Sequence, residues 1–310
     1  MDYVLGSKPS REAGLPSYGK ATGAYHEFDT RISFPNFLKY SYSSQIPSVL
    51  TSPASLRYSQ WTGKSQKLPA SWEQVSPDEK PIIIRGSERI GITPDLTTGV
   101  YYKYDVKKML VLLNHEGRQV LLSVAKQVDI SDVGKKGFIL GSDDDWNYYY
   151  SGETGSAMTG LGWVKAYIYD YFSVGVHVQS GSSVRSGVFQ WIRAGWSGMN
   201  FVEKKHVING MKRYARNSKT VLESPRLPAP SQIASTYQRL SALPQNVLVE
   251  KCSTLQKARK QLAVQKSRVG VNEKQDSCVG VPKEQIIEEL MLEYFKNVLG
   301  KPALLRTTDL

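Results

Sequence analysis

The sequence is poor in the features that identify a reaction or a membrane protein. It contains no phosphate-binding glycine loop, dinucleotide fingerprint, zinc-protease helix or serine-hydrolase elbow. No run approaches about eighteen uninterrupted apolar residues, so we expect no membrane-spanning helix. The first eight residues lack the apolar core of a signal peptide. The compartment is left open, with a soluble cytoplasmic chain favoured over a mature exported one that carries an added methionine.

Cysteine and histidine are also scarce. Cys252 and Cys278 are the only cysteines in 310 residues, too few for a disulfide framework or a zinc site. They either stay free thiols or close one loop, and their spacing does not decide between the two. The four histidines are scattered, without the spacing of metal ligands, at positions 26, 115, 177 and 206. We therefore expect no active site centred on histidine.

One cluster of carboxylates stands out. Residues 143–145 are three consecutive aspartates, and Glu153 follows nearby. A calcium loop needs its oxygen ligands at alternating positions, and three adjacent aspartates cannot all point at one ion. A solvated loop is favoured over a metal site. The sequence thus predicts no metal, no cofactor and no catalytic residue.

Positive charge, by contrast, is abundant and unevenly spread. The formal net charge is +12, and residues 200–310 hold 19 lysines and arginines against 10 acidic residues. Residues 251–268 contain six of these cations and no acid, together with a stripe of leucines. Such a segment binds nucleic acid or an anionic membrane surface, or it is a solvated helix that packs its leucines on the domain. The solvated helix is favoured. If the segment instead binds nucleic acid or a membrane surface, its partner is anionic.

Prolines and apolar patterns divide the chain into three segments. Residues 1–80 are rich in Pro, Ser and Tyr and show no sustained apolar period, so we expect an irregular segment that wraps the core through its aromatic side chains. Residues 81–224 hold strand patterns and one helix pattern. Residues 225–310 begin with three prolines and continue as a basic helical region. Its helices are expected at about 231–242, 246–268 and 282–299.

The central segment has the alternation of apolar and polar residues that marks half-buried strands. Strands are predicted within residues 82–113, 120–124, 163–178 and 184–193. Seven glycines argue against a helix in the loop-rich stretch 129–162. The expected fold is α+β, with an antiparallel sheet of at least five strands followed by one long helix.

This order of elements resembles the START-like helix-grip (SRPBCC-type) superfamily over about residues 80–224. The resemblance is carried by the strand 184–193, the link 194–200 with its Trp196, and the helix 201–222. It implies a sheet curved around the last helix, with a hydrophobic cavity between them. Its implied ligand is a hydrophobic or lipid-like molecule.

The residues expected at this cavity fall into two groups. Tyr102, Tyr104, Phe172 and Met211 offer apolar bodies with a few hydroxyl groups, although the same side chains also suit a solid core. The second group consists of Lys126, Asp170 and Trp146.

Each residue of the second group has an alternative. Asp170 shares the strand face of Ile168 and Phe172, where a carboxylate needs a partner such as Lys126. A bulge near residue 170 that turns Asp170 outward is favoured over this pairing. Trp146, on the glycine-rich stretch, is expected to touch a ligand or to fold back as a lid. His177 is assigned to the outer face of its strand.

Three functions remain open at this point. The first is a non-catalytic binding protein for a hydrophobic or lipid-like small molecule, held between sheet and helix. The second is an interaction protein whose basic C-terminal helices dock on nucleic acid, an anionic membrane surface or an acidic partner. An enzyme on the same scaffold is third, with Asp170 and Lys126 as its one acid–base pair.

Overall fold

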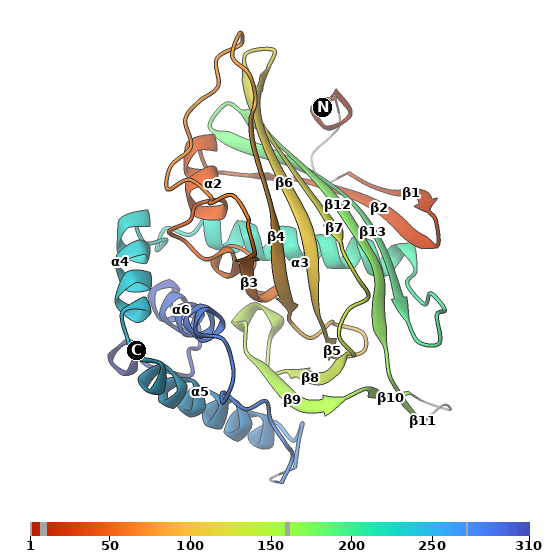
Figure 1. Cartoon of the computed structure of the whole chain (residues 1–310), viewed down its shortest axis with the longest axis vertical. Coiled ribbons are helices and arrows are strands. Elements are labelled where there is room, and N and C mark those ends of the chain that lie inside the picture. The colour runs from red at the N-terminus through yellow and green to blue at the C-terminus, as the bar shows by residue number, and fades with distance from the viewer. Residues whose placement is uncertain (1, 7–10, 159–161, 271) are drawn as a thin grey trace.

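The computed structural model describes residues 2–6, 11–158, 162–270 and 272–310. Its main element is an antiparallel sheet of eight strands in the order β1-β2-β13-β12-β7-β6-β4-β3 (Figure 1). The predicted α+β class is confirmed, as is the antiparallel sheet. The strands are β1 Glu12–Tyr18, β2 Ala21–Thr30, β3 Leu56–Thr62, β4 Ile82–Ile92, β6 Lys103–His115, β7 Arg118–Gln127, β12 Tyr167–Ser180 and β13 Ser183–Gly195.

Shorter strands lie beside this sheet. β5 (Val100–Tyr101), β8 (Lys135–Ile139) and β9 (Tyr148–Thr154) form a second sheet, and β10 (Ser156–Met158) pairs with β11 (Gly162–Val164). The stretch predicted to be loop-rich therefore contains short strands. In its described residues the one helical element is the 3₁₀ turn η2 (Asp143–Asp145), so the expected lack of an α-helix is confirmed there.

The long helices fall close to their predicted ranges. They are α3 Lys204–Leu222, α4 Pro230–Ser241, α5 Gln245–Gln265 and α6 Lys283–Leu299. The shorter ones are α1 Asp2–Leu5, α2 Phe34–Ser41, and the 3₁₀ helices η1 Ser48–Leu50 and η3 Thr307–Asp309. Val207, Met211 and Ala215 are buried at helical spacing along α3, which packs chiefly on β2 and β13. Within the described parts of the chain, no helix combines the length and the apolar character needed to cross a membrane.

The N-terminal segment is not irregular, and this prediction was wrong. Residues 1–80 contribute three strands of the main sheet, with β2 paired to both β1 and β13. Nearly all of β2 is buried, including Glu27 at 0% exposure. Because both faces of β2 are covered, its sequence lacks the apolar–polar alternation of a half-buried strand.

One core joins the three segments. Its largest cluster combines Leu50 before β3, Leu110 on β6, and Ile286 and Leu290 on α6. Helices α4, α5 and α6 gather beside the edge of the sheet that ends with β3, and α6 packs on β3 and η1 (Figure 1). The C-terminal helices therefore bury their apolar stripes against each other and against the sheet.

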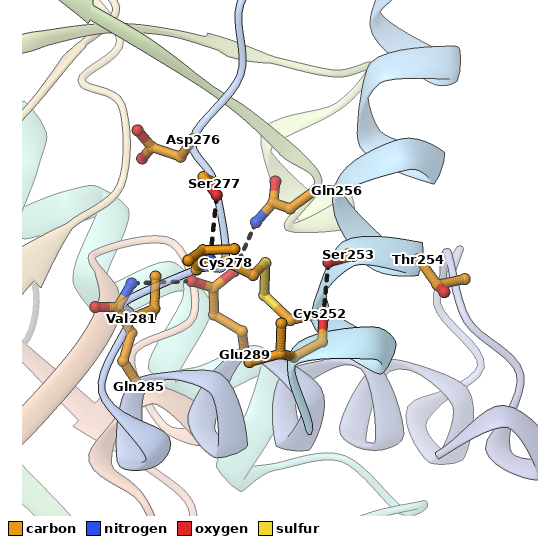
Figure 2. Close-up of a disulfide and its surroundings, with 12 residues drawn as sticks. Cys252, Ser253, Thr254, Gln256, Asp276, Ser277, Cys278, Val281, Gln285 and Glu289 are labelled. Carbon is orange, nitrogen blue, oxygen red and sulfur yellow. Dashed lines mark hydrogen bonds between the residues drawn. A yellow bond between two sulfur atoms is a disulfide. The ribbon is translucent and has the colours of Figure 1, made fainter. Parts of the chain in front are cut away.

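The two cysteines form a disulfide. Cys252 lies on α5 and Cys278 in the segment before α6, with Cα atoms 6.1 Å apart (Figure 2). Both residues are buried. This decides between the two alternatives that the sequence leaves open, because neither thiol is free.

Candidate ligand-binding pocket

A pocket of about 410 Å³ lies between the main sheet and α3. Strands β4, β6, β7, β12 and β13 form its floor, and α3 and the chain between α2 and β3 form its walls. Its volume falls at the lower end of the range of roughly 300–1,000 Å³ that is typical of small-molecule sites. Figure 1 shows α3 running across one face of the sheet.

Small side chains keep the floor of the pocket hollow. Gly175 on β12 is paired with Ser123 on β7, and Ser173 is paired with Ala125. All four residues line the pocket, because alternate residues of a strand face the same side of a sheet. A Cβ atom on Gly175 would lie 3.0 Å from Nε2 of His177. Larger residues at these positions would fill the space that α3 leaves open.

Polar groups gather at one end of the pocket around His177. The ring of His177 is 2% exposed; its Nε2 lies 3.1 Å from the hydroxyl of Tyr42, and its Nδ1 lies 2.9 Å from the hydroxyl of Ser186. Burial lowers the pKa of His177 to about 4, because water no longer stabilises the charged ring. The imidazole is therefore neutral at pH 7.

An ion pair adds charge to the polar part of the lining. Nζ of Lys108 donates to the carboxylate of Glu88 at 2.8 Å, and the hydroxyl of Ser59 donates to the same carboxylate. Glu88 is 2% exposed, whereas the side chain of Lys108 keeps 16% of its surface exposed. Both side chains line the pocket. A buried pair of this kind loses much of its hydration. Removing either partner would therefore leave the other charge buried without compensation.

The other end of the pocket is apolar. On β12 the lining residues run in the order Ile168, Tyr171, Ser173, Gly175 and His177, so polarity increases along the strand. The isoleucine end is shared with residues of β4 and β13, which are Ile90, Ile92 and Ile192. The floor of the pocket thus offers an apolar surface at one end and hydrogen-bonding groups at the other. The walls add further polar side chains, which are Thr93, Asp95, His206 and Arg213.

Four of the residues predicted at the cavity lie on its side of the sheet. Tyr104 and Met211 are buried and line the pocket. Tyr102 belongs to the same apolar cluster as Tyr104 but lies outside the lining. Trp146 is 1% exposed, and its Nε1 donates to the side chain of Asn217 on α3. Trp146 is therefore a core residue that contacts α3, and it forms neither a lid nor a part of the lining.

The other three predicted residues lie on the opposite face, which corrects their assignment. The pairing of β12 with β13 shifts between Ile168 and Asp170, where a bulge is present. After it, Tyr171 faces the pocket and Phe172 faces away, stacked on Trp191 with ring centroids 5.5 Å apart. One extra residue in a strand reverses the face of every residue that follows.

The same bulge separates the proposed acid–base pair. Asp170 is exposed and pairs with Arg193 at 3.3 Å rather than with Lys126. Lys126 is exposed and lies opposite Phe172 in register. The bulge that the sequence favours for Asp170 is thus present, and the pairing with Lys126 is wrong.

Sequence reasoning also missed residues that do line the pocket. The outer face predicted for His177 is wrong, because that face follows from counting alternate residues from Ile168 without the shift that the bulge adds. Tyr42 comes from the segment predicted to be irregular. Glu88 lies on a strand that the sequence predicts from its isoleucines alone, so its own position on the strand was not considered. The small residues Ser173 and Gly175 were the available signal, since such residues in mid-strand leave space above a sheet.

Comparisons with known proteins add little to this geometry. No protein-family model matches the chain, and no curated protein matches it. Among solved structures, the chain is similar to the human StarD13 (DLC2) lipid transfer and protein localization domain, with 11% sequence identity. The match covers 70% of this chain and 92% of that one, with a TM-score of 0.27. At this TM-score the two backbones superpose too poorly for the likeness to bear on function.

Proposed function

We propose that this protein binds a hydrophobic or lipid-like small molecule, without reacting with it, in the pocket between the sheet and α3. The supporting observation is the hollow floor, where Ser123, Ala125, Ser173 and Gly175 stand side by side. Protein interiors are close-packed, and voids larger than a water molecule are few. A row of small residues beneath a helix is the arrangement expected of a chain that leaves room for a ligand.

The lining supports a ligand with an apolar body and one polar end. The isoleucines of β4, β12 and β13 would cover the apolar body, which gains about 25 cal/mol for each Å² removed from water. The hydroxyl of Tyr42 and the ammonium of Lys108 are the hydrogen-bonding groups that a polar end would meet. The volume of about 410 Å³ suits a compact or single-chain molecule.

We assign no reaction to the pocket. The imidazole of His177 is held between two hydroxyl groups, and Lys108 is neutralised by Glu88. Ser186 lies outside the pocket lining, and an imidazole with a pKa lowered to about 4 is a weak base. Neither arrangement therefore presents an activated nucleophile to a ligand. Asp170 and Lys126, the pair first considered for catalysis, lie outside the pocket and do not meet.

Two adjacent residues of β12 provide a matched test. Ser173 points into the pocket and Val174 points away from it. Ser173→Phe should abolish binding of 11-(dansylamino)undecanoic acid, and Val174→Phe should leave it unchanged, with circular dichroism confirming that both variants fold. Native mass spectrometry should also find a hydrophobic molecule on the purified wild type. The proposal fails if the wild type carries no such molecule and does not bind the fluorescent acid.

A second candidate function rests on the basic C-terminal region. Lys257, Lys266 and Arg268 are exposed on α5 and just after it, and residues 200–310 carry a net charge of +9. Arg259 does not contribute, because it is buried against Glu289. We propose that these cations dock on nucleic acid, an anionic membrane surface or an acidic partner. Such binding must weaken steeply as salt rises, so its absence at low salt would remove this candidate.

A further inference from the structure

Helix α3 contains one glycine, Gly210, well inside the helix. Glycine weakens a helix relative to alanine, because it loses more backbone freedom on folding. No crowding explains its presence, since a Cβ atom built on Gly210 has no heavy atom within 4 Å. Its φ angle is negative, so the backbone does not require glycine either. The position therefore has room for a Cβ atom, and neither packing nor backbone conformation requires glycine there.

Gly210 also marks the place where the pocket meets solvent. It lines the pocket, and it is the one lining residue that is exposed. His206 and Arg213 lie one turn before and after it on the same side of α3 and also line the pocket. Thr93 and Asp95 in the turn after β4 also line the pocket, and Arg213 reaches the carbonyl oxygen of Pro94 between them. The opening thus lies between α3 and the β4–β5 turn.

Arg213 fixes the width of this opening. Its Nη1 donates to the carbonyl oxygen of Pro94 at 3.2 Å, and its Nε donates to the carboxylate of Asp143 at 2.9 Å. The residue is 8% exposed, so these hydrogen bonds are shielded from competing water. α3 is therefore tied to the β4–β5 turn directly beside Gly210.

We propose that Gly210 forms the entrance of the pocket and that its missing side chain sets which molecules pass. The ligand reaches the pocket between Gly210 and the Thr93–Asp95 turn, in the gap beside the Arg213 bridge. This inference rests on the proposed function and adds to it the residue that selects ligands by their cross-section. A single acyl chain passes the gap, whereas a side chain at position 210 obstructs it.

A block applied after folding tests the entrance. Gly210→Cys introduces a thiol that can be modified with N-phenylmaleimide, because the two natural cysteines are joined in a disulfide. Modification should lower both the association and the dissociation rate constants of 11-(dansylamino)undecanoic acid by about tenfold or more, measured by stopped-flow fluorescence. Asn209→Cys is the matched control, since Asn209 is exposed next to Gly210 and does not line the pocket. Its modification should leave both rate constants within about twofold of the wild type.

The outcomes separate the entrance from the pocket. Unchanged rate constants in modified Gly210→Cys, with normal binding by the wild type, would overturn the entrance alone. If Ser173→Phe binds the fluorescent acid as tightly as the wild type, the probe occupies another place, and the proposed function fails together with the entrance. Gly210→Phe provides a second obstructing variant without chemical modification, and it should slow both rate constants in the same way.

Discussion

Glu289 on α6 is a buried carboxylate with four side-chain partners in the described part of the chain. Burial alone would raise its pKa, but the guanidinium groups of Arg57 and Arg259 hold the pKa below its usual value. Nε of Arg57 donates to it at 2.9 Å, and the amides of Gln256 and Gln285 point at it from either side (Figure 2). A charge taken out of water is tolerated here because its hydrogen-bond partners Arg57, Arg259, Gln256 and Gln285 are all donors.

The Glu289→Gln variant should therefore be strongly destabilised. Removing one partner of a buried ion pair leaves the other charge uncompensated, which lowers the free energy of unfolding by about 3–5 kcal/mol. Urea denaturation followed by circular dichroism measures this loss. Asp170→Asn is the matched control, because the side chain of Asp170 is 57% exposed in its pair with Arg193. This change should alter the free energy of unfolding by less than about 1 kcal/mol. Similar losses in both variants would contradict the role given to Glu289.

A second prediction at this scale concerns pH. Burial lowers the pKa of His177 from 6.5 to about 4. Above pH 6.5 the imidazole is neutral in both the folded and the unfolded chain. Below pH 6.5 the imidazole binds a proton in the unfolded chain but stays neutral in the folded chain. The free energy of unfolding therefore falls as the pH drops from 6.5 toward 4.

Between pH 7 and pH 5 this effect amounts to about 2 kcal/mol of the free energy of unfolding. His177→Gln should remove that part of the pH dependence. The pKa of His26 is also lowered by burial, so the variant retains a smaller slope. Urea midpoints of the wild type and the variant at the two pH values give the comparison. Equal pH dependence in both would show that His177 is protonated in the folded state.

At the scale of elements, the disulfide secures the segment that connects α5 and α6. Cys252 and Cys278 close a loop of 26 residues in sequence separation. Beside it, Asp276 accepts hydrogen bonds from Arg57 at 2.8 Å and from the hydroxyl of Tyr101 at 2.7 Å. The covalent link thus holds a carboxylate of the connecting segment against the sheet.

Replacing both cysteines by serine should lower the free energy of unfolding by about 3 kcal/mol, because the unfolded chain regains the freedom of the loop. Limited digestion with trypsin gives a second readout. Cleavage is expected first between Lys266 and Lys274, both of which are exposed. The two fragments of the wild type should then stay joined until a reductant is added. Separation without a reductant would show that the disulfide is not formed in the protein.

The elements differ in how far the sequence predicts them. The C-terminal helices were predicted within a few residues, because prolines and amphipathic stripes are local signals. Strands β1, β2 and β3 were not predicted. For β2 the reason is that the strand is buried on both faces and carries Glu27 inside. No pattern of period two remains in such a strand. Their place in the sheet depends on pairing with β13 and β4, which are distant in sequence.

The site was predictable only in part, for a related reason. Both faces of β12 carry apolar residues, such as Ile168 toward the pocket and Val174 away from it. Hydrophobicity therefore did not show which face turns inward, and the bulge before Asp170 reversed the assignment. Tyr104 and Met211 line the pocket, and no irregularity precedes them in their elements. His177 and Gly175 become evident only when the register is known.

At the scale of the whole molecule, the three segments read from the sequence depend on each other. Arg57, from the N-terminal segment, is 4% exposed and finds both of its carboxylate partners in the C-terminal segment. The largest core cluster likewise joins Leu50, Leu110 and Ile286. A boundary drawn at residue 225 would cut through one core and one ionic network. We therefore expect the full chain to unfold in a single transition.

Truncation after residue 224 tests this expectation. The shortened chain would leave Arg57 buried without Glu289 and Asp276, and it would expose the surface of β3 and η1 that α6 covers. We expect it to be insoluble, or to show no cooperative thermal transition by near-ultraviolet circular dichroism. Removal of residues 1–10 is the control. It takes away α1 with its buried residue Val4, whereas the described members of the largest core cluster begin at Ile32. This variant should still unfold cooperatively. A cooperative transition in residues 1–224 alone would instead establish the C-terminal helices as a separate domain.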